Sequence, residues 1–250
     1  MILGMPKRLV WGYIALAVFM AGDGFDLTFL SRYLVTQHGF TSTQAGLCFT
    51  VYGLVVAFSA WTTGVLAETF GAKRLMLLGG ILWIGLHVLF LTVGLISPVA
   101  AILTYGARGI AYPLFMYSFV VLIAQSVDPG RLASAMGWFW AAFSVGLGSL
   151  GAFIPTLTIP HLGETGTLWL APVLVGAGTL MCLFLVPKAP PEERTAERLE
   201  GADRARELLR GVTILVENRQ ILLSVIIRIL CNLTLYGFPM MMPLYLTGQL

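Results

Sequence analysis

Apolar stretches long enough to cross a lipid bilayer recur along this chain. About 20 helical residues span the roughly 30 Å of hydrocarbon in a bilayer. Stretches of at least that length predict seven membrane-spanning helices, at residues 9–34, 45–67, 75–96, 99–124, 132–155, 167–186 and 221–246. The predicted fold class is therefore all-α, a polytopic helical bundle in a membrane.

The overall composition agrees with this interpretation. Of the 250 residues, 58% are hydrophobic and 11% are charged, whereas about a quarter of the residues in soluble domains are charged. The first apolar stretch is too long for a signal-peptide core and contains acidic residues, so we expect it to be retained. All three cysteines, Cys48, Cys182 and Cys231, fall inside predicted spans. They are interpreted as small buried side chains and not as a disulfide framework or a zinc site.

Lysine and arginine are distributed unequally between the connections. The amino-terminal segment and the connections after the second, fourth and sixth spans contain twelve basic residues, and the alternate connections contain none. Basic residues favour the cytoplasmic side, which predicts a cytoplasmic amino terminus in an inner membrane. Residues 188–219, which begin a helical pattern after two prolines, are predicted to form a cytoplasmic amphipathic linker. Its bases alternate with acids, so the net charge of +3 does not indicate nucleic-acid binding.

One cytoplasmic connection carries a recognisable motif. The sequence GVLAETFGAKR, residues 64–74, resembles the signature loop of the major facilitator superfamily, although Thr69 stands where a base is usual. We expect this substitution to weaken the ion-pair network of the loop. The residues that match the motif, here called the signature loop, are Gly64, Glu68, Gly71, Lys73 and Arg74.

Within that superfamily the chain resembles the bacterial polyol permeases that import ribitol and arabinitol. The resemblance rests on residues 9–35, 86–95, 105–119, 134–148 and 153–171, and becomes sparse after residue 186. It implies a major facilitator fold with an amino-terminal six-helix bundle at residues 1–187, the linker at 188–219, and the first helix of a second bundle at 220–250. The glycine-rich sequence at residues 144–155 lacks the Gly-Pro pair associated with antiporters, which favours uptake.

Two aspartates lie in the middle of the first predicted span. A charge at the centre of a membrane helix costs about 2.5–3.5 kcal/mol on insertion scales, so Asp23 and Asp26, which share a helical face, should point into the bundle. Arg108, near the middle of the fourth span, offers the opposite charge. The sequences GDGF at 22–25 and ARGI at 107–110 also place opposite charges before a glycine, a faint internal echo of the family's three-helix repeats.

Three roles are open to these charged groups. One aspartate could carry a proton, because its proton affinity responds to small changes in distance and hydration beside Arg108. Alternatively, both acids could belong to a fixed salt-bridge network, or they could bind substrate hydroxyls directly without proton transfer. We predict proton coupling through Asp23, Asp26 and Arg108, since two neighbouring carboxylates are poorly tolerated as anions in a low dielectric.

An uncharged linear polyol needs hydrogen-bonding groups and apolar faces. The predicted substrate-binding residues are Asp26, Tyr112, Gln125, Trp138, Trp140, Asn232 and Tyr236. In contrast, Trp11, Trp83 and Trp169 are expected to serve packing or the interfacial belt. His87 is expected to be a neutral, hydrogen-bonded core residue. Glu164 is interpreted as a turn residue of an outer loop.

The predicted function is import of a linear polyol or related sugar by proton symport with alternating access. We expect no enzyme activity, cofactor or metal, because the sequence contains no nucleophile with a base, no metal-ligand array and no phosphate cradle. The full-length protein is expected to act as a monomer on a neutral polyol and protons in the bilayer. The alternatives are a carrier for another sugar or a carboxylate, which Arg108 and Arg228 could hold, and a nontransporting membrane sensor.

Overall fold

Local capping signals fix the ends of several helices in the computed structural model, which describes residues 5–188, 217–232, 238–246 and 248. Thr41 and Gln44 form a reciprocal capping box at the start of α3. Ser97 caps α5, whose first residue is proline. Gly39, with a φ of 68°, ends α2 in the left-handed conformation that glycine adopts most readily.

Most of the described chain is helical, and no strand occurs in its described ranges. The elements in chain order are η1 (Lys7–Leu9), α1 (Val10–Asp23), α2 (Asp26–His38), α3 (Ser42–Phe70), α4 (Ala72–Thr92), η2 (Gly94–Ile96), α5 (Pro98–Arg108), α6 (Ala111–Ala124), η3 (Pro129–Arg131), α7 (Leu132–Ser144), the π-helical turn η4 (Val145–Leu150), α8 (Gly151–Leu185), α10 (Arg219–Asn232) and α11 (Phe238–Leu246). The all-α prediction is confirmed.

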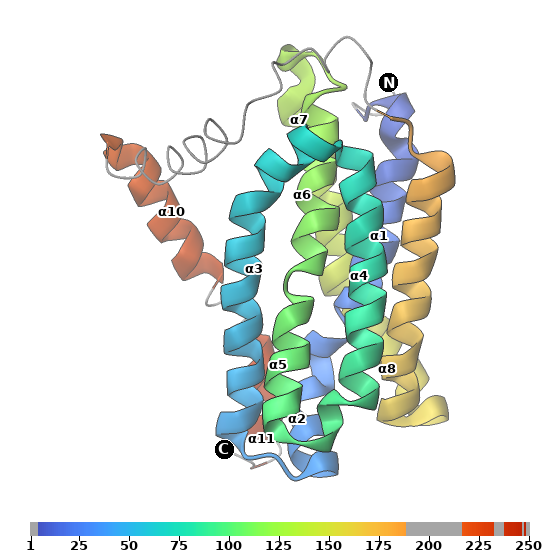
Figure 1. The fold of residues 1–250 in the computed structure, drawn as a ribbon, viewed down its shortest axis with the longest axis vertical. Helices are drawn as coiled ribbons and strands as arrows, with labels where there is room; N and C mark the ends of the chain where they lie inside the picture. The colour runs from blue at the N-terminus through green and yellow to red at the C-terminus, as the bar shows by residue number, and fades with distance from the viewer. Residues whose placement is uncertain (1–4, 189–216, 233–237, 247, 249–250) are drawn as a thin grey trace.

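The long helices run up and down one common axis and form a bundle (Figure 1). Five helical stretches in the described residues are long and apolar enough to cross a membrane, and the last of them covers residues 129–185. That last stretch turns back at Gly163, whose φ of 72° and ψ of 174° are not helical, so it crosses the bundle twice. The described chain therefore makes the six passages that hydropathy predicts for residues 9–186.

Two details differ from the predicted spans. The first and fourth spans are each interrupted by a tight turn, between α1 and α2 at Gly24 and between α5 and α6 at Gly109, where the backbone dihedrals stay right-handed helical. The outer connection predicted at residues 156–166 is helical apart from the turn at Gly163, because α8 continues through it.

The predicted seventh span falls on two helices. They are α10 and α11, and the residues between them are not described. Of the two, α11 packs against α2, whereas α10 projects away from the bundle (Figure 1). The linker predicted at 188–219 lies almost entirely outside the described residues, so it and the domain division stay predictions.

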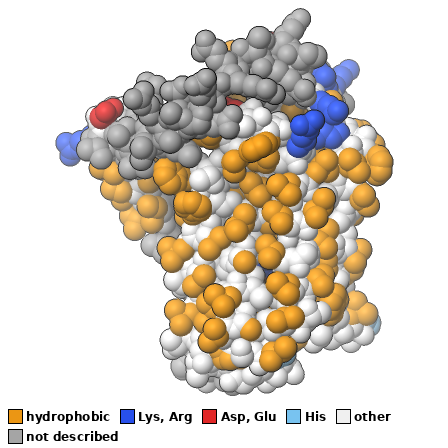
Figure 2. Space-filling view, viewed as in Figure 1, with side chains coloured by type: hydrophobic (Ala, Val, Ile, Leu, Met, Phe, Trp, Pro, Cys, Tyr) orange, Lys and Arg blue, Asp and Glu red, His pale blue; other side chains and the backbone are white. Residues whose placement is uncertain are grey.

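The core of the bundle is built around α1. It packs against α8, α7 and η4, while α4 lies between α6 and α8, and α3 covers α5 and α6. Apolar side chains also cover the flank of the molecule, as a surface in contact with lipid requires (Figure 2). The larger group of Lys and Arg side chains visible in that view lies at the end of the bundle where the amino terminus lies, and a smaller one lies to the left, away from the bundle.

Candidate functional site

Both interrupted spans place a charged residue at the interruption. Helix α1 ends at Asp23, and α2 begins at Asp26. Likewise α5 ends at Arg108, with Gly109 directly after it. The two breaks coincide with the GDGF and ARGI sequences, so the internal echo in the sequence corresponds to a repeated structural feature.

The helix ends suit the charges that they carry. Asp26 lies in the first turn of α2, where the helix dipole is positive, and Arg108 lies in the last turn of α5, where it is negative. Each such placement is worth about 0.3–1 kcal/mol at an exposed site, and more in a partly buried one.

The three charged side chains meet in the interior. Asp23, Asp26 and Arg108 are 7%, 3% and 1% exposed. Arg108 Nη2 donates to Asp26 Oδ2 in a buried ion pair, and Arg108 also interacts electrostatically with Asp23. Asp26 Oδ1 and Arg108 Nε have no hydrogen-bond partner among the described residues.

Helix α4 supplies neutral partners to this group. The indole Nε1–H of Trp83 donates to Asp23 Oδ1, and Arg108 Nη1 donates to His87 Nδ1. The donor–acceptor distance is 2.6 Å in both hydrogen bonds. Trp83 and His87 are one turn apart, and their rings stack with centroids 4.6 Å apart and 12° between planes. We call Asp23, Asp26, Trp83, His87 and Arg108 the ionic cluster.

Aromatic rings surround the guanidinium of Arg108. Its Cζ lies 4.5 Å from the ring centroid of Tyr105, 4.8 Å from that of Trp83 and 5.5 Å from that of Tyr52. Ring faces attract a cation, and the attraction is larger where water is excluded. The rings therefore offset part of the desolvation of Arg108 without neutralising its charge.

The structure places the predicted substrate-binding residues in different regions. Tyr112 is half-buried and stacks on Tyr52, 6.4 Å between centroids, next to the ionic cluster. Gln125 caps the opposite end of α6 from the break, about 20 Å along a 14-residue helix at 1.5 Å per residue, and so does not join the cluster. Trp138 packs against the core. Trp140 is 36% exposed and packs edge-on against Phe139 and Phe143.

Two of the predicted substrate-binding residues belong to the seventh span. The side chain of Asn232 and the whole of Tyr236 lie outside the described residues, as does the side chain of Arg228.

Trp83 and His87 were not expected among the functional residues. The prediction for Trp83 was packing or an interfacial belt. Its indole is fully buried, which agrees with packing and not with a belt, and it also donates a hydrogen bond to Asp23. The available signal was the spacing of four between two polar-edged rings in the middle of an apolar span, which places them on one helical face.

Similarity to known proteins agrees with the arrangement of the bundle. The sequence profile of the Major Facilitator Superfamily matches residues 12–250. The chain belongs to the Major Facilitator Superfamily. A solved major facilitator structure, that of the human organic anion transporter MFSD10 (TETRAN), matches 84% of this chain and 55% of its own with a TM-score of 0.61 and 18% identity, which supports the fold alone.

Several curated members of the superfamily are more similar in sequence. The chain is 47% identical to the "Ribitol transporter" of Klebsiella pneumoniae over 249 residues, and 45% identical to the "D-arabinitol transporter" of the same organism over 250 residues. It is 34% identical over 248 residues to the "Alpha-ketoglutarate permease" of Bacillus subtilis (strain 168). Each alignment covers 98–99% of this chain, which spans 55–58% of the length of these relatives.

The superfamily's signature loop lies at the end of the bundle that carries the basic residues. Gly71 has a φ of 92°, which explains a glycine at this turn. Lys73 Nζ donates to the backbone oxygens of Leu183 and Val186, so it caps the end of α8. In the part of the chain that the structure describes, Glu68 and Arg74 form no ion pair, and the weakening expected from Thr69 stays a prediction.

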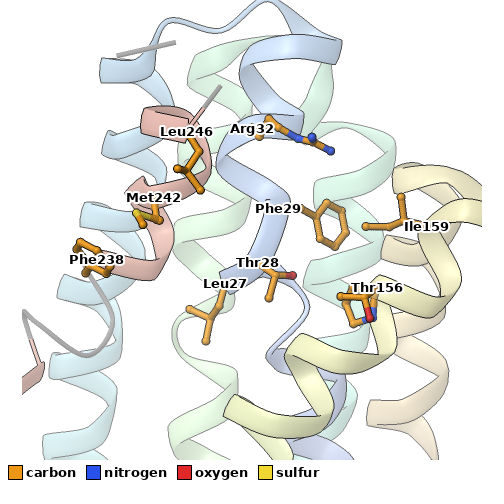
Figure 3. A pocket seen from close by; sticks show the side chains of 10 residues that line it. Leu27, Thr28, Phe29, Arg32, Thr156, Ile159, Phe238, Met242 and Leu246 are labelled. Atoms are coloured by element: carbon orange, nitrogen blue, oxygen red, sulfur yellow. The ribbon is translucent and has the colours of Figure 1, made fainter. Parts of the chain in front are cut away.

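A pocket of about 690 Å³ lies between α2, α8 and α11 (Figure 3). Its lining is mainly apolar, with Thr28, Arg32 and Thr156 as polar members, and includes none of the five predicted binding residues whose side chains are described. Arg32 pairs with Glu164, which joins α2 to α8. Glu164 was predicted to be a turn residue, and it lies directly after the turn at Gly163.

Proposed function

We propose that this chain forms the amino-terminal half of a secondary carrier that imports a linear polyol by proton symport with alternating access. It would work as a transporter and not as an enzyme. The names of the ribitol and D-arabinitol transporters, at 47% and 45% identity, support this substrate class. Because the chain spans about 58% of those relatives, the second half of the carrier would supply the rest of the substrate site.

The observation that carries the proposal is the charge balance of the ionic cluster. Two buried aspartates face one buried arginine, and the described part of the cluster contains no second cation. With both carboxylates ionised the cluster has an excess negative charge in a medium of low dielectric. One proton balances it. A carrier that opens alternately to each side could therefore take up this proton on one side and release it on the other.

The arrangement around Arg108 favours a neutral substrate. Its charge is already paired with Asp26, whereas Asp26 Oδ1 and Arg108 Nε lack partners among the residues described. A buried polar atom without a partner costs about 1–3 kcal/mol. A hydroxyl both accepts and donates, so a polyol has the chemistry to satisfy either the carboxylate oxygen or the N–H.

The second candidate is a carboxylate substrate. It is favoured by the 34% identity to the "Alpha-ketoglutarate permease" and by the presence of Arg108 in the interior. A carboxylate would have to compete with Asp26 for the guanidinium, and removing one member of a buried pair is strongly unfavourable. We therefore prefer the polyol.

The proposed setting is the inner membrane, crossed several times, with the amino terminus in the cytoplasm. The basic residues at one end of the bundle support this orientation. The carrier would act as a monomer in the bilayer, with the polyol and protons as its partners and no role for nucleic acid.

Uptake of radiolabelled ribitol, D-arabinitol and α-ketoglutarate, by cells expressing the complete gene with and without a protonophore, tests the proposal. We expect accumulation of a polyol that the protonophore abolishes. Accumulation of α-ketoglutarate alone would establish the second candidate, and polyol accumulation that resists the protonophore would remove proton coupling.

A further inference from the structure

Helix α4 carries no charged residue in its membrane-buried part, yet it forms hydrogen bonds with both an anion, Asp23, and a cation, Arg108, of the ionic cluster. We propose that His87 is a positioning residue that keeps the guanidinium of Arg108 on Asp26 and away from Asp23. This inference rests on the proposed function, because it assigns the free proton-binding position to Asp23.

The hydrogen bonds of His87 define its protonation state. A guanidinium has only donors, so the ring Nδ1 must accept from Arg108 Nη1. A backbone carbonyl only accepts, so the ring Nε2–H must donate to the oxygen of Leu168, at 3.1 Å. Both nitrogens are then satisfied only in the neutral ring with its hydrogen on Nε2. His87 thus acts as a fixed acceptor for Arg108, anchored on α8.

The cluster contains a competition that His87 resolves. Arg108 pairs with Asp26 and also interacts electrostatically with Asp23, so the two carboxylates compete for one cation. Its Nη2 donates to Asp26 while its Nη1 is committed to His87. Asp23 instead receives the indole N–H of Trp83. The two stacked rings on α4 therefore give each aspartate a different partner. Asp26 pairs with the cation of Arg108, and Asp23 accepts a hydrogen bond from the neutral indole of Trp83.

Loss of the acceptor at position 87 would undo this division. Arg108 Nη1 would become a buried charged donor without a partner, which is strongly unfavourable. The carboxylate of Asp23 is an acceptor of the opposite charge within the same cluster. We therefore expect the guanidinium to turn toward Asp23, neutralise it and remove its ability to exchange a proton.

Three substitutions separate this role from a general packing role. His87→Asn keeps an acceptor near the position of Nδ1. His87→Gln instead keeps a donor near the position of Nε2 and so preserves the link to Leu168. His87→Leu removes both. Each variant is made in the complete carrier, and protein level and thermal stability in detergent are measured together with accumulation and with counterflow exchange of labelled ribitol.

We expect His87→Asn to accumulate ribitol at close to the normal rate. His87→Leu and His87→Gln should each lose accumulation by about 10- to 100-fold, the factor that a lost hydrogen bond to a charged group is worth. The expected order of thermal stability is Asn above both Gln and Leu. Rescue by Gln and not by Asn would show that the link to α8 is what matters, and normal accumulation by His87→Leu would also overturn the proposal.

A double variant tests the competition itself. If Arg108 moves to Asp23 in His87→Leu, Asp26 loses its counterion, so counterflow should be impaired in that variant. In Asp23→Asn/His87→Leu the competing carboxylate is gone, Arg108 stays on Asp26, and counterflow should be restored. Absence of restoration would contradict the proposed movement. The order of thermal stability does not depend on transport, so it tests the Arg108–His87 hydrogen bond even if the wild-type carrier does not move ribitol. Failure of the wild-type carrier to move ribitol would count against the proposed function alone.

Discussion

The pair formed by Asp26 and Arg108 is buried between α2 and α5, and each member makes the other tolerable in the membrane interior. A buried pair adds little to stability compared with apolar residues, but removal of one partner leaves an uncompensated charge. The two residues should therefore behave very differently when they are changed singly and together.

Asp26→Asn should destabilise the carrier by up to about 3–5 kcal/mol, because Arg108 loses the carboxylate that it is paired with and must turn to Asp23 instead. Asp26→Asn/Arg108→Gln should recover most of that loss while transport stays absent. The measurement is thermal unfolding of the detergent-solubilised carrier, in which size-exclusion chromatography gives the fraction of folded protein left after heating. A single variant as stable as wild type would show that the ion pair does not hold the interior together.

Helix breaks at Gly24 and Gly109 organise the bundle at the level of its elements. An added Cβ at Gly24 would lie 2.4 Å from the backbone oxygen of Leu147 in η4, and one at Gly109 would lie 2.7 Å from that of Tyr52 in α3. Each break is therefore pressed against the backbone of a neighbouring helix. The π-helical turn η4 packs on the break between α1 and α2, next to the cluster.

Gly24→Ala should cost about 1–3 kcal/mol, the usual penalty for overpacking, because backbone atoms must move apart. Gly85→Ala on α4 is the matched control, since a Cβ there meets nothing within 4 Å. Both are measured as thermal stability and ribitol uptake. Equal behaviour of the two variants would argue against close packing at the break.

Hydropathy predicted the helices at this scale but not their interruptions. The six passages follow from the length of the apolar stretches. A glycine inside a membrane span is common, however, so nothing local marked Gly24 and Gly109 as breaks. The contacts of Trp83 and His87 join residues between 21 and 81 positions apart, and such pairings depend on the packing of whole helices.

For the molecule as a whole, the placement of basic residues predicts orientation in the membrane. Lys7, Lys73 and Arg131 belong to connections at one end, whereas Ser97 lies in a connection without basic residues. Reporter fusions after Arg131 should be fluorescent with green fluorescent protein and inactive with alkaline phosphatase, and fusions after Ser97 should give the reverse. The opposite result at both sites would invert the orientation.

The central claim is that the ionic cluster couples polyol entry to proton entry through Asp23. The most direct measurement is the pH of a lightly buffered suspension of energy-depleted cells that express the complete carrier, recorded when ribitol or D-arabinitol is added. We predict alkalinisation of the medium with the wild-type carrier, and none with Asp23→Asn, although that variant should still exchange labelled polyol across the membrane. Polyol entry without alkalinisation in the wild type, or unchanged alkalinisation in Asp23→Asn, would contradict the account.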